Sequence, residues 1–299
     1  MKYRVEKDSC GEKKVPGEAY YGVETVRALE NYPISGCRFH PDFIWALAIV
    51  KKACACANQD LKILDPKRAK AIIQASDEIL CGKWHDQFVT DVLQSGAGVS
   101  VHMNTNEVIA NRALEIMGGK KGHYRDLSPH DHVNRGQSTN DVIPTAMRLA
   151  TLKLIQKFYS SSEQLEKAFS KKSKEFRKIV KAGRTHMQDA APITLGQEFS
   201  GWARQLEKGR GRIQALAENL KELGIGGSAV GTGLNTTLAY RRKVVENLKA
   251  ETKFSVKSAE NLFEVMQSDA DFAGVSGGLR DYALSLVQIS HDLRLLSSG

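Results

Sequence analysis

Two segments of the chain place apolar residues at alternating intervals of three and four, and this spacing strongly restricts the fold. The pattern runs over residues 195–223, with Gly209 at the one interrupted position, and again over residues 272–296. Such heptad spacing forms a narrow stripe on a helix, which is buried only against other helices. A third helical pattern covers residues 141–180 and spans about 60 Å at ~1.5 Å per residue. We therefore expect a bundle of long helices, completed by a continuing chain or by other subunits.

The composition agrees with a helical globular protein. Of the 299 residues, 41% are hydrophobic and 26% are charged, whereas only 7% are aromatic and seven are proline. These values suit a helical chain better than a β-sandwich. Glycine and proline punctuate residues 1–40, which predicts loops and a short hairpin there. We expect a mainly all-α fold, with a small N-terminal domain at residues 1–137 and a long-helix bundle at residues 138–299.

Several classes of protein are disfavoured by the sequence. The five cysteines lack paired spacing, which indicates reduced thiols in a cytoplasmic protein. The longest apolar run, residues 43–50, is too short to span a bilayer, and the N-terminus lacks the apolar core of a signal peptide. The formal net charge is +9, but the basic cluster at residues 167–181 is interleaved with apolar residues at helical spacing. We predict a solvated helix face there, and no nucleic-acid or membrane partner, although a positive field attracts acidic substrates.

The first candidate site is the segment Ser138-Thr139-Asn140-Asp141, where the longest helical pattern begins. Side-chain oxygens of these residue types cap helix N-termini, and Pro144 suits the first turn of a helix. A helix N-terminus has unpaired N–H donors and a partial positive charge, so polar side chains beside it can hold a small carboxylate. Taken alone, the segment fits a well-capped helix better than a site, because caps are far commoner.

A second polar segment covers residues 94–113. A glycine-containing loop leads into a helix on which Asn104, Glu107 and Asn111 share one face. Asparagine is a mediocre helix former, so these side chains need partners, either in an interior network or in a site. His130 and His132 follow in a loop, but no HExxH or Cys/His spacing accompanies them, so we predict no metal site.

The third polar segment, residues 183–198, contains Thr185 and His186 and is predicted as a turn between two long helices. Imidazole suits proton transfer near neutral pH, whereas a turn rich in capping residues is the simpler interpretation. A glycine-rich segment follows at residues 224–235. It lacks a Walker lysine and a preceding strand, so it does not predict a nucleotide site, but its glycines permit close packing beside one.

Four segments together resemble the aspartase/fumarase superfamily, and within it the aspartate ammonia-lyases. They are residues 95–113, 133–145, 183–202 and 227–235, and the resemblance covers nearly the whole chain. It implies a homotetramer with a central bundle of long helices and active sites built from three subunits. It also implies reversible anti-elimination of ammonia from L-aspartate to give fumarate, without an organic cofactor.

The resemblance further implies roles for individual residues. Ser138, Thr139 and Asn140 correspond to a substrate-binding trio. Thr185 and His186 correspond to a pair that contacts the carboxylate and amino ends of the substrate, and His186 is the catalytic candidate. Removing a proton beside a carboxylate gives a dianionic intermediate, which hydroxyls, amides and helix N-termini stabilise. Because a long helix separates the two groups along the chain, we expect them to converge only between subunits.

Two departures from the family pattern affect these expectations. Val99 stands where the family usually has threonine. Valine cannot donate a hydrogen bond, so the identity of the substrate stays open, although Ser100 offers a compensating hydroxyl. The family's serine base and its Pro-Gly-Lys-Val-Asn-Pro segment do not occur in these 299 residues. We therefore expect an N-terminal part of the enzyme that is inactive by itself.

Two alternatives remain open from the sequence. Residues 30–36 resemble the corresponding segment of aspartases, which favours an aspartase over a fumarase. Ser128 and His130 stand where class II fumarases carry a histidine and an asparagine. Class II fumarate hydratase is nevertheless the alternative enzyme. The non-enzymatic alternative is a helical scaffold or a nucleic-acid binder. Tight binding of a nucleic-acid duplex that weakens steeply with salt would support a nucleic-acid binder.

Overall fold

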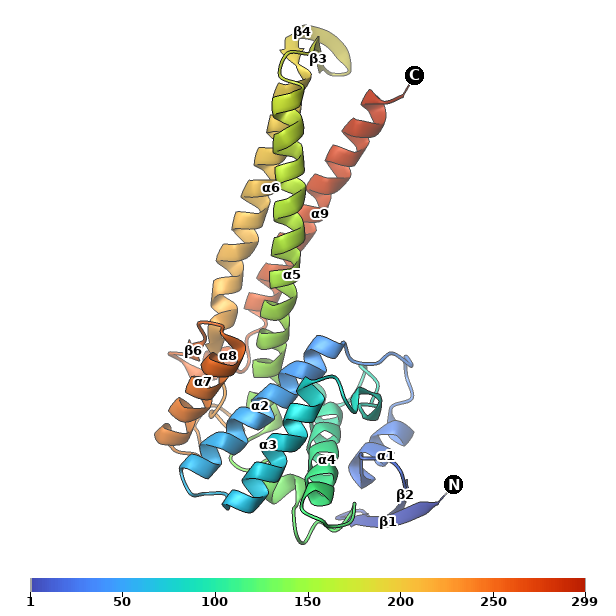
Figure 1. The fold of residues 1–299 in the computed structure, drawn as a ribbon, viewed down its shortest axis with the longest axis vertical. Helices are drawn as coiled ribbons and strands as arrows, with labels where there is room; N and C mark the ends of the chain where they lie inside the picture. The colour runs from blue at the N-terminus through green and yellow to red at the C-terminus, as the bar shows by residue number, and fades with distance from the viewer. Residues whose placement is uncertain (1, 299) are drawn as a thin grey trace. The chain divides into compact units, whose positions relative to one another are not determined.

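The computed structural model describes residues 2–298 and divides them into two compact units, each of which is described by itself (Figure 1). The first unit comprises residues 2–151 and 221–268, and the second comprises residues 152–220 and 269–298. Helices dominate both units, which confirms the mainly all-α fold, while the predicted domain boundary after residue 137 stays a prediction. Within residues 2–298, every helix is too short or too polar to cross a bilayer.

The elements of each unit follow the chain order. The first unit contains β1 (Tyr3–Asp8), β2 (Gly11–Pro16), α1 (Val23–Asn31), α2 (Pro41–Asp60), α3 (Pro66–Leu80), α4 (Val99–Ile116), the start of α5 (Thr139–Glu175), β5 (Glu222–Leu223), α7 (Leu238–Thr252), β6 (Lys257–Ser258) and α8 (Leu262–Val265). The second unit contains the remainder of α5, β3 (Val180–Thr185), β4 (Gln188–Thr194), α6 (Leu195–Glu218) and α9 (Ala270–Leu296). The strands pair as β1 with β2 and β3 with β4, both antiparallel, and β5 with β6, parallel.

The core of the first unit lies between α2, α3 and α4. Both α2 and α3 begin at a proline, which needs no N–H partner in a first helical turn. The side chain of Asp65 accepts the Arg68 N–H and caps α3. Fully burying each Leu or Ile stabilises the fold by about 1.5–3 kcal/mol. The large apolar residues of this core include Ile44, Leu64, Ile72, Ile79, Ile109, Leu114 and Leu127.

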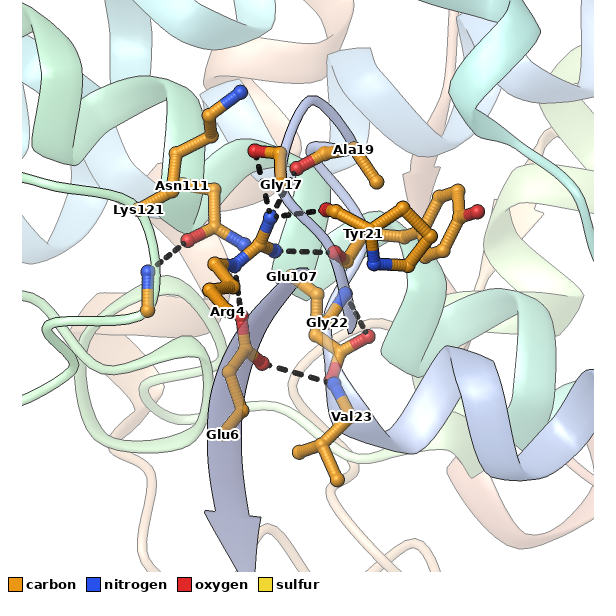
Figure 2. Close-up of polar contacts among 12 residues, drawn as sticks. Arg4, Glu6, Gly17, Ala19, Tyr21, Gly22, Val23, Glu107, Asn111 and Lys121 are labelled. Carbon is orange, nitrogen blue, oxygen red and sulfur yellow. Dashed lines mark hydrogen bonds and ion pairs between the residues drawn. The ribbon is translucent and has the colours of Figure 1, made fainter. Parts of the chain in front are cut away.

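The predicted N-terminal hairpin is present, and buried and partly buried hydrogen bonds hold its end against α1 (Figure 2). The Arg4 guanidinium donates to the carbonyls of Ala19 and Tyr21, each at 2.7 Å, and pairs with Glu6 at 2.7 Å. Glu6 in turn accepts the Val23 N–H, at 2.9 Å, in the first turn of α1. A charged side chain buried in this way needs such partners, so the hairpin determines where α1 begins.

The polar face of α4 forms an interior network, which was one of its two predicted roles. Asn104, Glu107 and Asn111 are each at most 1% exposed. Glu107 accepts the N–H groups of Gly22 and Thr25 and the Thr25 hydroxyl, at 2.6–3.1 Å. These bonds satisfy unpaired donors at the start of α1. Burial nevertheless raises the pKa of Glu107 to about 7.

The core of the second unit is aromatic and lies between α5, α6 and α9. Phe199 and Trp202 pack edge to face with ring centroids 4.8 Å apart, and the Tyr282 and Ser162 hydroxyls share a hydrogen bond of 2.8 Å. Gly209 occupies the interrupted heptad position because a Cβ there would lie 2.8 Å from the Tyr282 ring. The heptad stripes therefore face a shared core, as their spacing predicted.

Two predicted helix ends and one predicted turn in the bundle are wrong. The first long helix ends at Glu175 rather than near residue 180, and α6 ends at Glu218 rather than residue 223. Residues 180–194 form the β3–β4 hairpin rather than a plain turn. The backbone of Leu195 and Gly196 donates to the carbonyls of Ile179 and Phe176, so the returning chain takes the place of further helical turns. β-Branched residues around 179–180 and 193–194 also favour strands.

Candidate active site at the start of α5

The site begins with a cap at the N-terminus of α5. The Ser138 hydroxyl accepts the Asn140 N–H at 3.3 Å, and the Ser138 N–H donates to the Asp141 carboxylate at 2.9 Å. The two bonds resemble a capping box and make the first turn rigid. Pro144 lies within α5 rather than in its first turn, because the helix already starts at Thr139. Pro144 therefore has no N–H for the Asn140 carbonyl four residues earlier.

Asp141 connects this helix to the glycine-rich segment that follows β5. Its side chain accepts the N–H groups of Gly226 and Ser228, at 3.1 and 3.0 Å, in addition to that of Ser138. Burial raises the pKa of Asp141 to about 6, and the three N–H donors oppose that shift. The Asn140 amide donates to the Ala229 carbonyl at 2.7 Å. The glycine-rich segment is thus hydrogen-bonded to the first turn of α5.

A buried lysine and histidine lie behind the trio. His102 Nδ1 is 2.7 Å from the Thr139 hydroxyl, and His102 Nε2 is 2.7 Å from Lys51 Nζ. Lys51 also donates to the side-chain oxygens of Asn134 and Gln137, at 3.0 and 2.8 Å. Both Lys51 and His102 are at most 1% exposed, whereas Thr139 is half-buried. Burial lowers the pKa of Lys51 to about 7 and, together with the Lys51 charge, holds that of His102 well below its usual range.

The glycine-containing loop before α4 lies beside the start of α5. A Cβ on Gly98 would lie 3.1 Å from the Ile143 side chain, and Gly98 has a φ of +94°, so only glycine fits there without strain. Val99 is 42% exposed next to this glycine, whereas Ser100 is buried. Val99 therefore presents an apolar surface where the family pattern leads one to expect a hydroxyl.

A cavity of about 750 Å³ lies between α1, α4 and the segment after residue 127. Val99, Ser100, Ser128 and His130 are among its lining residues, but Ser138, Thr139 and Asn140 are not. His130 hydrogen-bonds to the Glu24 carboxylate, which raises the pKa of the imidazole. Among residues 2–298, no three His, Cys, Asp or Glu side chains are grouped as metal ligands would be.

Thr185 and His186 lie in the second unit, at the tip of the β3–β4 hairpin. Thr185 pairs with Gln188, and the two residues between them, His186 and Met187, have φ values of +50° and +60°. Positive φ at both central positions is the geometry of a tight type I′ hairpin turn, which usually contains Asn and Gly. All three residues from Thr185 to Met187 are exposed. The roles of Thr185 and His186, and their meeting with the trio, stay predictions.

The structure brings the trio together with two residues that the sequence interpretation missed, Lys51 and His102. A signal for Lys51 was present, because it lies four residues after Leu47 and three before Cys54 on the apolar face of α2. A charged residue on such a face requires buried partners. His102 stood within the second polar segment, but its partners come from other parts of the chain.

Comparison with known proteins identifies the family. Residues 11–299 match a family model described as lyase. Aspartate ammonia-lyase from Bacillus subtilis is 50% identical over 297 residues, which cover 99% of this chain and 62% of that protein. Class II fumarate hydratase from Halobacterium salinarum is 50% identical over 263 residues, 88% of this chain and 56% of the relative.

Solved structures agree with the sequence comparison. A fumarate lyase:delta crystallin from Brucella melitensis, 44% identical, superposes with a TM-score of 0.98 and covers all of this chain and 65% of that one. The chain spans about 62% of the length of the Bacillus subtilis enzyme. The helical fold, the match over residues 11–299 and these relatives show that the chain belongs to the aspartase/fumarase superfamily of lyases.

Proposed function

We propose that the protein containing this chain is an aspartate ammonia-lyase, which converts L-aspartate reversibly to fumarate and ammonia by anti-elimination. The observation that carries the proposal is the start of α5, where two hydroxyls and an amide stand at a helix N-terminus on a buried, hydrogen-bonded support. A relative with this activity, 50% identical over 99% of the chain, favours aspartate as the substrate.

In this reaction the trio binds a carboxylate of the substrate. The hydroxyls of Ser138 and Thr139 and the amide of Asn140 donate hydrogen bonds at the positive end of α5. These donors are fixed before the substrate arrives, so they also stabilise the extra negative charge of the dianionic intermediate. Thr185 and His186 act on the other end of the substrate from a neighbouring subunit of a homotetramer.

Class II fumarate hydratase is the second candidate. The Halobacterium relative favours it. Val99 favours neither enzyme, because it removes a hydroxyl that the family pattern as a whole leads one to expect. Water rather than ammonia would then add to fumarate, while the trio would keep the same carboxylate-binding role.

A product assay separates the two activities. The protein, expressed with whatever residues follow Gly299 in its gene, is incubated with fumarate in the presence and absence of ammonium, and the products are identified by proton NMR. We expect aspartate to form only with ammonium. Malate without aspartate would identify a fumarase, and neither product would overturn both assignments.

A substitution in α5 tests the role of the trio in the same assay. Thr139→Val removes the hydroxyl and keeps the shape, so we expect kcat/KM to fall about tenfold to hundredfold, as for loss of one hydrogen bond to a charged group. Thr151→Val is the matched control, because the Thr151 hydroxyl bonds only to the Met147 carbonyl of its own helix among the contacts in residues 2–298. Equal effects of the two substitutions would refute the assigned role.

A further inference from the structure

Three buried side chains form a continuous line of hydrogen bonds that ends at the trio. Lys51 Nζ contacts His102 Nε2 at 2.7 Å, and His102 Nδ1 contacts Thr139 Oγ1 at 2.7 Å. Lys51 uses its other two directions for Asn134 Oδ1 and Gln137 Oε1, at 3.0 and 2.8 Å. The ammonium thus has three acceptors for its three N–H groups, all of them uncharged.

The chemistry of these groups gives the line a direction. An ammonium only donates, so His102 Nε2 must accept from it. A neutral imidazole that accepts at one nitrogen carries its proton on the other, so His102 Nδ1–H donates to the Thr139 oxygen. The Thr139 oxygen already accepts one bond from within the protein, which leaves its O–H to point outward as a donor.

We propose that Lys51 and His102 are positioning residues that hold the Thr139 hydroxyl as a hydrogen-bond donor toward a carboxylate of the substrate. The inference rests on the proposed function, because it takes Thr139 to be a carboxylate-binding residue. The consequence is preorganisation: the hydroxyl does not have to rotate away from a competing acceptor when the anion binds.

The direction depends on the charge of Lys51. A free amine can accept from Nε2–H, which would let Thr139 donate inward to Nδ1 instead. Burial lowers the pKa of Lys51 to about 7. The titratable groups that face the pair are Cys54 and Asp141 around Lys51, and His130 at longer range from His102. Burial raises the pKa of Cys54 to about 12, so this thiol stays neutral while Lys51 titrates.

A bound dicarboxylate favours the ammonium and so raises the pKa of Lys51. We therefore expect affinity for fumarate to fall as the pH rises through the pKa of Lys51 in the free protein. The fall over that range should be smaller when Lys51 is replaced by methionine.

The first experiment determines where the His102 proton lies. Nitrogen NMR of protein with labelled histidine rings distinguishes Nδ1–H, Nε2–H and the imidazolium, and the signal that is lost in His102→Asn belongs to His102. We expect the neutral Nδ1–H form at a pH well below the pKa of Lys51, where the ammonium predominates. The Nε2–H form or the imidazolium at that pH would overturn the proposal, whatever reaction the protein catalyses.

The second experiment measures the effect on substrate, in protein that carries whatever residues follow Gly299 in its gene. His102→Phe and Lys51→Met should each lower kcat/KM about tenfold, as expected for lost orientation of one hydrogen bond. His102→Asn keeps an N–H close to the place of Nδ1, so it should recover most of the loss. A merely structural role would instead lower kcat/KM equally in both His102 variants, and that result would overturn the proposal.

The matched control uses the neighbouring lysine of α2. Lys52 pairs with Asp77 and Glu251, each at 2.9 Å, and takes no part in the line. Lys52→Met should leave kcat/KM and its pH dependence unchanged. An Nδ1–H tautomer together with absent lyase activity would reject the proposed function alone, whereas active enzyme with the Nε2–H tautomer would reject the positioning role alone.

Discussion

The adjacent lysines Lys51 and Lys52 should respond to pH in different ways, which tests the buried network through protein stability. Lys51 is 0% exposed, and burial lowers its pKa from the usual 10.5 to about 7. Lys52 is partly buried, which lowers its pKa, but Glu251 and Asp77 raise it more. The perturbation is the substitution of each lysine by methionine, which keeps a long side chain and removes the charge.

The magnitude follows from the two pKa values of Lys51. One pKa unit corresponds to about 1.36 kcal/mol, so the shift from 10.5 to about 7 corresponds to about 5 kcal/mol. Between these values the unfolded chain binds a proton that the native protein does not, so the free energy of unfolding rises with pH. The cost of burying the ammonium is fully present below the native pKa and disappears above the unfolded one. Over two pH units inside this window, wild type should gain about 3 kcal/mol relative to Lys51→Met.

The assay is urea denaturation followed by tryptophan fluorescence, at a series of pH values. All samples have the same protein concentration, because self-association makes apparent stability depend on it. Lys52→Met should show a constant difference from wild type across the window, since its raised pKa moves any change to still higher pH. A constant difference for Lys51→Met as well, or one of opposite sign, would refute the buried-cation argument.

Three further predictions concern the fold and the chain as a whole. Gly22→Ala would place a Cβ 2.5–2.7 Å from oxygens of Tyr124, Glu6 and Glu107, so we expect the free energy of unfolding in urea to fall by about 2–5 kcal/mol. The control is Gly211→Ala, where a Cβ would meet open space, and it should change the free energy of unfolding by less than about 1 kcal/mol. Trp202→Ala should lower the free energy of unfolding by about 3–5 kcal/mol, and a loss under about 1 kcal/mol would contradict its place in the aromatic core. Residues 1–299 alone should self-associate in light scattering but form no fumarate from aspartate, and a monomer or substantial turnover would contradict this.

The bundle was predictable because the periodic spacing of apolar residues indicates which face of each helix is buried. Heptad spacing placed Phe199 and Trp202 on the buried face of α6, and both lie in the core of the second unit. Packing also explains the interruption at Gly209. The Tyr282 ring of α9, which is far away in the sequence, fills the space that a side chain at residue 209 would need. The polar face of α4 was likewise visible, because mediocre helix formers at helical spacing require buried partners.

The hairpin at residues 180–194 escaped prediction for a different reason. The two-residue turn has positive φ at His186 and Met187, but neither is the Asn or Gly that normally marks such a turn. Left-handed backbone at bulky residues costs about 1–3 kcal/mol each and persists only where the surroundings enforce it. The pairing of β3 with β4 supplies that constraint here, and it depends on register rather than on the residues of the turn.

The support of the trio lies beyond the reach of sequence patterns because each of its parts has an ordinary explanation alone. From the sequence, Lys51 could be a lysine whose stem lies along an apolar helix face while its charged end reaches solvent. His102 could be one more polar residue of α4. Only the packing of both helices against residues 134–139 joins them into one line of donors and acceptors. In the proposed function, the trio supplies the groups that face the anion, whereas α2 and α4 supply the residues that we infer to orient the Thr139 hydroxyl. A chain with the same trio but without Lys51 and His102 would therefore need another donor behind Thr139 to bind a carboxylate equally well.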